Sequence, residues 1–326
     1  MPTTSDPMST PVSDAGHILV NNPSPIVAYS PVVLNVPGRV VKLELRVSAP
    51  ESGSGLPVIL LSHGHGRSVF LSSMLGYAPL VDFWASHGFA VIQPTHLDSG
   101  MLGLRGADDP DAPLYPRSRA EDMRHILDHL DEIEDAVPGL AGRLDRSRIA
   151  VAGHSLGGHT ACVLLGMRFV DPNDGTDVDL KDERVIAGVV LAAPGNGNLS
   201  ARASENYPFL RHADFSTMTA QALVVAGDKD LNPMFSDRLS WRWDAYTQSP
   251  GPKVLLTMFG AEHILGGVTG YDAAEATDQS PERGATLRAM AWAYLRSTLY
   301  PGDPSWDNAV AALRGSADPL GKVESK

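Results

Sequence analysis

Cysteine is nearly absent from this chain of 326 residues, in which Cys162 is the only example. One cysteine excludes an internal disulfide framework and any zinc site built from several thiolates. Positive charge is also scarce, because 26 Lys and Arg residues stand against 38 Asp and Glu residues and leave a formal net charge of −12. This balance argues against binding to nucleic acid or to an anionic membrane, since both partners attract basic surfaces.

Long hydrophobic runs are missing as well. The apolar runs, such as Val185–Ala193, are much shorter than the roughly 18 residues of a membrane-spanning helix. Residues 1–16 are rich in Ser, Thr, Pro and Asp, and they lack the basic and apolar parts of a secretory signal peptide. We therefore expect a cytoplasmic protein without a membrane span. With 43% hydrophobic residues, a chain of this length can bury a core without disulfides or metals.

Short apolar runs alternate with helical patterns along the chain. The runs have the length and the Val, Ile and Leu content of strands buried on both faces: Val58–Leu61, Phe89–Ile92, Ile149–Ala152, Val185–Ala193, Ala222–Ala226 and Val254–Met258. An earlier stretch with alternating polarity, Arg39–Val47, predicts a half-buried strand. The helical patterns cover Arg117–Val137, Leu156–Phe169 and Pro281–Leu299. This alternation predicts an α/β fold with a mostly parallel central sheet and helices on both faces.

The composition of the two ends differs from that of the middle. We expect a disordered N-terminal arm over residues 1–25, a single α/β domain over 26–313 and a flexible C-terminal tail over 314–326. In parallel sheets of this kind, binding and catalytic groups collect at the carboxyl ends of the strands. Polar residues that directly follow an apolar run are therefore the candidates for chemistry.

The predicted strand Ile149–Ala152 leads into Gly153-His154-Ser155-Leu156-Gly157-Gly158 and then into a predicted helix. This is a G-x-S-x-G pattern in the strand–turn–helix setting that exposes a nucleophilic serine. Small residues permit the sharp turn, and the helix N-terminus favours negative charge that develops beside the serine. The alternative is a tight turn with an incidental serine. The setting favours Ser155 as a nucleophile.

A serine hydroxyl needs a base that removes its proton, and that base needs an acid that fixes its tautomer. In this setting the partners follow later strands in the order serine, acid, histidine. The run Ala222–Ala226 ends in Gly227-Asp228-Lys229-Asp230, and the run Val254–Met258 is followed by Glu262-His263. These residues provide His263 as the candidate base and either Asp228 or Asp230 as the candidate acid.

Together these motifs resemble those of α/β-hydrolases over roughly residues 30–300. Within that superfamily the chain is similar to the branch of chlorophyllase-like, platelet-activating-factor-acetylhydrolase-like and dienelactone-hydrolase-like proteins. The motifs that carry the narrower resemblance are Ser62-His63-Gly64-His65-Gly66, the spacing Arg119…Asp122…Asp128, Gly153–Gly158, and Asp182–Val185 leading into Leu191–Pro194. The resemblance implies an α/β-hydrolase fold. Segments 97–116 and 195–218 are long enough to shape the pocket but too short for a cap of several helices, so we expect no large cap domain.

Carried over residue by residue, the resemblance implies Ser155 as nucleophile and His263 as base. It selects Asp230 over Asp228, because the acid of the family lies three residues after a glycine at the strand end. The backbone N–H groups of His65 and Leu156 would form the oxyanion hole.

The function implied is that of a serine hydrolase that cleaves small to medium carboxylic esters through an acyl-enzyme. Amidase, thioesterase and lactonase activity with the same triad remain alternatives, and so does a non-catalytic binding protein with this fold. We expect a small-molecule ester substrate, no nucleic-acid partner and no cofactor, and we leave the oligomeric state open.

Other candidate residues receive plainer interpretations. His63 and His65 suggest a metal, but no third ligand accompanies them, so we expect a glycine-rich turn and no metal. The acidic stretch between Asp171 and Asp182 lacks the glycine of a calcium loop and predicts a solvated loop. We expect Cys162 to be a small buried residue. For the remaining histidines we expect packing positions for His154 and His159, the pocket rim for His96, and a solvated helix face for His125 and His129.

Overall fold

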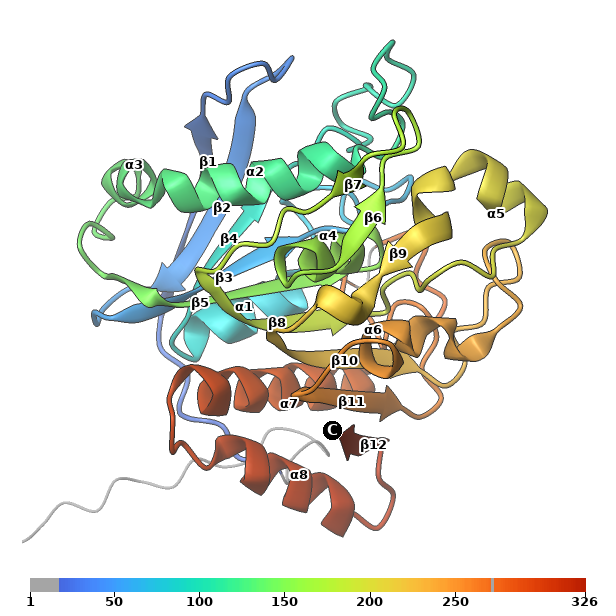
Figure 1. Cartoon of the computed structure of the whole chain (residues 1–326). Coiled ribbons are helices and arrows are strands. Elements are labelled where there is room, and N and C mark those ends of the chain that lie inside the picture. The colour runs from blue at the N-terminus through green and yellow to red at the C-terminus, as the bar shows by residue number, and fades with distance from the viewer. Residues whose placement is uncertain (1–17, 271–272) are drawn as a thin grey trace, which may run out of the picture.

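The computed structural model describes residues 18–270 and 273–326. Its main sheet has nine strands in the order β1-β2-β4-β3-β5-β8-β10-β11-β12 (Figure 1). The strands are β1 (Ile26–Leu34), β2 (Leu43–Pro50), β3 (Leu56–Ser62), β4 (Ala90–Pro94), β5 (Leu144–His154), β8 (Val185–Leu191), β10 (Gln221–Gly227), β11 (Lys253–Met258) and β12 (Gly321–Ser325). The strands from β4 to β11 in this order are parallel, and β1, β2 and β12 are antiparallel to their neighbours. The predicted mostly parallel sheet is confirmed.

Helices cover both faces of the sheet, as Figure 1 shows. The helices are α1 (Ala78–Ser86), α2 (Pro116–Asp128), α3 (Leu130–Ala136), α4 (Leu156–Leu164), α5 (Ala201–Asn206), α6 (Asp244–Thr247), α7 (Pro281–Leu299) and α8 (Ser305–Gly315). Apolar residues of α2, α3, α4 and α6 form one core cluster with one face of the sheet. Those of α1, α7 and α8 form a second cluster with the opposite face. Central strands therefore lie between two apolar layers, which is why all residues of β3 and β4 are buried.

Two of the predicted helices differ in extent from the observed ones. The pattern over 117–137 forms two helices, because the chain leaves helical geometry at His129, which has φ −120° and ψ 27°. The pattern over 156–169 ends as a helix at Leu164, and Gly166 then turns the chain with φ +109°. The glycine is needed at this turn, since a Cβ there would lie 2.7 Å from the carbonyl oxygen of Thr217.

The chain after α4 forms a small second sheet that the sequence pattern did not predict. Its strands β6 (Arg168–Val170), β7 (Asp177–Val178) and β9 (Ala213–Asp214) are antiparallel and run in the order β7-β6-β9. Strands of two or three residues are too short to produce a recognisable alternation of polarity. Between β8 and β10 the chain contains β9 and short helices, which are α5 and the 3₁₀ turns η1 (Pro208–His212) and η2 (Phe215–Thr217). This segment does not form a large cap.

The described part of the N-terminal arm packs on the domain. Residues 1–17 of the predicted arm lie outside the described residues. Ile18 and Val20 pack against the second core cluster, and the Ser24 amide donates a hydrogen bond to the carbonyl oxygen of Ser86.

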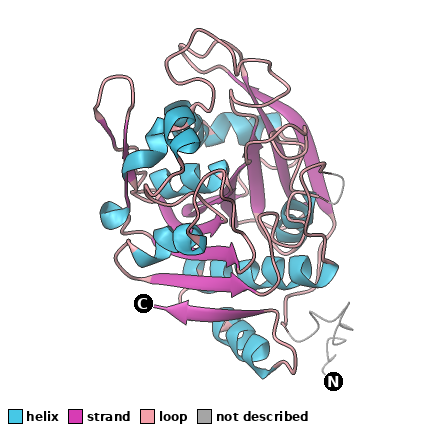
Figure 2. Ribbon diagram, turned by 90° about the vertical axis from the view of Figure 1, so that its right-hand side faces the viewer, coloured by secondary structure: helices cyan, strands magenta, loops and turns pink. Residues whose placement is uncertain are grey.

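The C-terminal segment also differs from the prediction of a flexible tail over 314–326. Residues 321–325 form β12, which pairs antiparallel with β11 at the edge of the sheet (Figure 2). Val323 packs against the second core cluster, and the Lys326 amide donates to the carbonyl oxygen of Lys253. The sequence of this strand is short and mostly polar, so it shows no pattern that predicts a strand. The segment is ordered because it pairs with β11. No helix between residues 18–270 or 273–326 has the length and apolar composition needed to cross a bilayer.

A truncation tests the contribution of β12. Deleting residues 316–326 should lower the free energy of unfolding by about 1–3 kcal/mol and the Tm by several degrees, because β11 loses its partner and Val323 its packing. Differential scanning calorimetry measures the change, with Asp318→Asn in the exposed loop as a control. An unchanged Tm in the truncated chain would show that the tail does not stabilise the domain.

Candidate active site

Ser155 occupies a sharp turn between β5 and α4. Its backbone has φ 56° and ψ −120°, a conformation that residues other than glycine rarely adopt. A Cβ on Gly153 would lie 1.9 Å from the carbonyl oxygen of Gly157, and a Cβ on Gly157 would lie 2.0 Å from that of Ser62. Glycine is therefore required at both positions. The strained turn exposes the Ser155 hydroxyl at the N-terminus of α4.

The structure brings the Ser155 hydroxyl, the His263 ring and the Asp230 carboxylate together. His263 Nε2 lies 2.9 Å from Ser155 Oγ, and His263 Nδ1 lies 2.9 Å from Asp230 Oδ2. Burial raises the pKa of Asp230, but the charges of His263 and Arg242 outweigh burial and hold the pKa below its ordinary value. An ionised Asp230 accepts the Nδ1 proton of His263, which leaves Nε2 as the acceptor for the serine hydroxyl.

Asp228, the alternative candidate for the acid, has different contacts from Asp230. Asp228 Oδ1 accepts a hydrogen bond from the Gly260 amide at 2.7 Å, which ties the loop after β10 to the loop after β11. Asp230 alone of the two is bonded to His263 among the contacts of the described residues. Only Lys229 separates the two aspartates in the sequence, and the path of the loop gives their carboxylates different partners.

Arg242 is a residue of this site that the sequence did not indicate. It belongs to the 3₁₀ turn η3 (Leu239–Trp243), and its Nε lies 3.0 Å from Asp230 Oδ2. Its side chain is only 5% exposed. No motif marks this arginine, because its distance from Asp230 is set by how the segment between β10 and β11 folds back.

His154, which precedes the nucleophile, does more than the packing expected of it. Its Nε2–H donates to the backbone carbonyl oxygen of His263 at 2.8 Å, and its Nδ1 lies 3.2 Å from the Tyr77 hydroxyl. The same hydroxyl accepts from the Gly64 amide at 2.8 Å. Burial, followed by the charge of His263, lowers the pKa of His154 to about 3, so this ring is neutral. The chain of bonds links the glycine-rich loop to the backbone that carries His263.

The glycine-rich loop after β3 lies against the N-terminus of α4. A Cβ on Gly157 would meet the carbonyl oxygens of Ser62 and His63, at 2.0 and 2.6 Å, so the two backbones are in direct contact. Within residues 18–270 and 273–326, the backbone N–H groups of His65 and Leu156 have no protein acceptor. An oxyanion hole requires two unpaired donors, so these two N–H groups are candidates for one.

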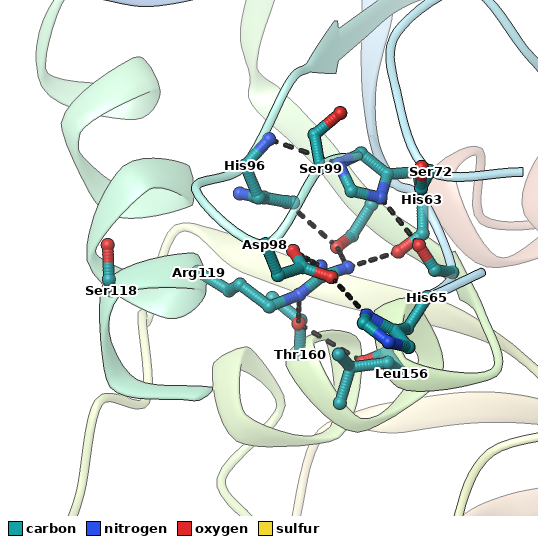
Figure 3. A network of polar contacts seen from close by, with 12 residues as sticks. His63, His65, Ser72, His96, Asp98, Ser99, Ser118, Arg119, Leu156 and Thr160 are labelled. Atoms are coloured by element: carbon teal, nitrogen blue, oxygen red, sulfur yellow. Dashed lines mark hydrogen bonds and ion pairs between the residues drawn. The ribbon is translucent and has the colours of Figure 1, made fainter. Parts of the chain in front are cut away.

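A buried network holds this loop in place (Figure 3). The Arg119 guanidinium donates to the carbonyl oxygen of His63 and to Asp98 Oδ1, and its Nε lies 3.1 Å from Thr160 Oγ1. The other oxygen of Asp98 lies 2.9 Å from Nδ1 of His65. Burial raises the pKa of Asp98, but Arg119 and the hydrogen bond from His65 outweigh it and hold that pKa well below the ordinary value.

His96 is not at the pocket rim, where the sequence placed it. It is fully buried, with Nε2 3.0 Å from Ser62 Oγ and Nδ1 2.9 Å from Asp122 Oδ2. Its amide donates to His63 Nε2 at 3.0 Å. His96 therefore points into the protein, because Asp122 of α2 and Ser62 at the end of β3 form hydrogen bonds with its ring.

Both ring nitrogens of His63 are occupied within the protein. Nδ1 donates to the carbonyl oxygen of Gly64 at 2.7 Å, while Nε2 accepts from the His96 amide. Burial and the charge of Arg119 lower the pKa of His63 far below its ordinary value. No group of three or more His, Cys, Asp or Glu residues in the described ranges is arranged to hold a metal ion.

The side chains of the remaining residues that the sequence singled out make their contacts elsewhere, although the His159 amide donates to the carbonyl oxygen of Ser155 at 3.2 Å. His159 is buried between the rings of Phe169 and Phe209, at centroid distances of 5.2 and 5.1 Å. Cys162 is fully buried, and burial raises the pKa of its thiol to about 12. His125 and His129 are half-buried and stack on each other with centroids 3.9 Å apart.

The sheet order, the covering helices and the strained turn at Ser155 define the fold of an α/β-hydrolase. No protein-family model matches the chain. A platelet-activating factor acetylhydrolase from Cavia porcellus is 28% identical over 154 residues. The match covers 37% of this chain and 34% of that relative, so the chain spans about a third of the relative's length. This distant similarity agrees with the α/β-hydrolase fold.

The Arg119–Asp98 pair can be tested by removing one partner. Arg119→Met should lower the free energy of unfolding by about 3–5 kcal/mol, because it leaves the Asp98 carboxylate buried without its counter-charge. Urea denaturation at neutral pH measures the loss. Arg117→Met on the same helix is the matched control, since its pair with Asp171 is 37% and 13% exposed and should cost about 1 kcal/mol or less. Equal losses in the two variants would contradict the role given to the buried pair.

Proposed function

We propose that the protein is a serine hydrolase that cleaves carboxylic esters of small to medium size through an acyl-enzyme intermediate. The observation that carries the proposal is the run of hydrogen bonds from Ser155 through His263 to Asp230, each of 2.9 Å, at a strained strand–helix turn. The similarity to an acetylhydrolase and the motifs shared with the chlorophyllase and dienelactone hydrolase branch support it.

In the first half-reaction Ser155 Oγ attacks the acyl carbon while His263 Nε2 removes the hydroxyl proton. Asp230 keeps the Nδ1 proton on His263 and stabilises the imidazolium that forms. His263 then delivers its proton to the alkoxide as the carbon–oxygen bond breaks. The alcohol leaves, and the acyl group remains on Ser155.

The tetrahedral intermediate carries a negative oxygen that needs hydrogen-bond donors. The N–H groups of His65 and Leu156 fill this role, and each donor of this kind is worth about 3–4 kcal/mol in the transition state. The network of Arg119 and Asp98 supports the His65 donor by fixing the loop in advance. Fixed donors are effective because they need no rearrangement during the reaction.

Water completes the reaction in the second half. His263 removes a proton from a water molecule, which attacks the acyl carbon and forms a second tetrahedral intermediate. The protonated His263 then returns its proton to Ser155 Oγ as the acid product leaves. This scheme uses the chain's own residues and needs no cofactor.

Esters are favoured over amides because an alkoxide leaves more readily than an amine anion. The name of the relative denotes an acetylhydrolase, which favours a substrate with a short acyl group for this protein as well. Thioesters and lactones share the leaving-group advantage. A p-nitrophenyl ester and a p-nitroanilide with the same acyl group separate esterase from amidase activity.

Replacement of the nucleophile tests the proposal. Ser155→Ala should reduce kcat for p-nitrophenyl acetate by roughly 10⁴-fold or more, because no other group can form the acyl-enzyme. Circular dichroism should show an unchanged fold. Ser147→Ala, an exposed serine on the same strand, is the control and should keep wild-type activity.

A fluorophosphonate probe provides the complementary measurement. It should label the wild-type protein at Ser155 and leave Ser155→Ala unlabelled, since labelling requires an activated serine. Absence of labelling together with absence of ester hydrolysis would favour a binding protein of this fold instead.

The physical form of the substrate gives another expectation. The segment between β8 and β10 contains the six-residue helix α5, whose sequence ARASEN has no apolar face that could cover the site as a lid. We expect the rate of tributyrin hydrolysis to saturate below the solubility limit of this ester. A sharp rise in rate when droplets appear would contradict a lidless esterase.

A further inference from the structure

Arg242 contacts the segments that directly follow two parallel strands, β8 and β10. Its Nε lies 3.0 Å from Asp230 Oδ2 in the loop after β10. Its Nη1 donates to the carbonyl oxygen of Ala192 after β8 at 3.1 Å. The guanidinium also lies over the neighbouring Trp241 ring, 5.0 Å from its centroid. These contacts fix the planar group from three directions.

The oxygen that Arg242 binds is the same one that binds His263. Asp230 Oδ2 accepts from Arg242 Nε at 3.0 Å and from His263 Nδ1 at 2.9 Å. Both the carboxylate and the guanidinium are nearly inaccessible to water, with 2% and 5% of their side-chain surfaces exposed. An arginine stays charged when it is buried. The positive charge of Arg242 is therefore separated from the His263 ring only by the Asp230 carboxylate.

We propose that Arg242 is a positioning residue of the candidate triad, which orients Asp230 toward His263 and whose charge opposes protonation of His263. The proposal rests on the proposed function, because it assigns Arg242 an effect on the base of that reaction. Two consequences follow. A well-oriented Asp230 raises kcat, and the positive charge of Arg242 disfavours a second positive charge on the His263 ring.

Other charged groups surround His263, and they are the same in the wild type and in the variants below. The titratable and charged groups on the adjoining elements are His154, Asp228, Lys229, Asp230, Arg242, Glu262, Asp278 and Arg283. His154 is neutral, because burial lowers its pKa to about 3. Glu262 is bonded to Thr277 and Asp278 to Arg283. Arg242 is the cation of this set that contacts the acid of the triad.

The experiment compares pH profiles of kcat/KM for p-nitrophenyl acetate. Arg242→Gln keeps a donor near Asp230 but removes the positive charge. Protonation of His263 then becomes easier, so the acid limb of the profile, where activity falls with decreasing pH, should move upward by about 0.5–1.5 pH units. Arg242→Lys keeps the charge but cannot reach both Asp230 and Ala192 in the same plane. Its kcat should fall about tenfold, with KM within twofold and the acid limb unmoved.

Arg238→Gln is the matched control, because Arg238 lies in the same segment and is paired with Asp244, away from His263. Its profile should match that of the wild type. If Arg242→Gln folds and loses activity without a shifted acid limb, Arg242 is only a structural residue and the proposal is overturned. If Arg242→Gln does not fold, the lysine variant decides, and a wild-type kcat there overturns the proposal. A wild-type protein without esterase activity and without fluorophosphonate labelling would instead reject the proposed function.

Discussion

The side chain of Arg119 connects the segments on which the candidate site depends. From α2 it reaches the end of β3, the loop after β4 and the second turn of α4, through His63, Asp98 and Thr160. A guanidinium presents five donors in one plane, so one residue can fix several backbones at once. Its charge lies in a fully buried position, where the Asp98 carboxylate compensates it. Without this pair, the loop that carries His63 and His65 would lose the hydrogen bonds that Arg119 and Asp98 make to it.

A second buried pair of an arginine and a carboxylate lies at the candidate site. Arg242 compensates Asp230 as Arg119 compensates Asp98, and each carboxylate also binds a histidine through Nδ1, His263 in one case and His65 in the other. A buried carboxylate is costly unless it is paired and hydrogen-bonded, and both carboxylates are. Pairing keeps each acid ionised, and an ionised acid fixes the orientation and tautomer of its histidine. The donors and the base of the candidate site are thereby held in place before a substrate arrives.

The strained turn at Ser155 and these ion pairs support each other. The turn is possible because Gly153 and Gly157 allow backbone contact between β5, α4 and the end of β3. That contact places the glycine-rich loop after β3 against the N-terminus of α4, while Tyr77 and His154 link the loop to the backbone of His263. A displacement of any one segment therefore changes the geometry at the others. The apolar layers on both faces of the sheet provide the rigid support for this arrangement.

The sequence by itself determined the parallel sheet, the turn around Ser155 and the position of His263 after a strand, because apolar runs and glycine spacing are local signals. It did not reveal β12 or the small sheet of β6, β7 and β9, whose short strands are ordered by their partners. The resemblance to α/β-hydrolases already favoured Asp230 over Asp228, and the tertiary structure brings the Asp230 carboxylate to His263. Only the tertiary structure decided that His96 turns inward and that Arg119 and Arg242 pair with buried acids. These features depend on side chains from distant segments meeting in space, and the path of a loop over two or three residues decides which of them meet.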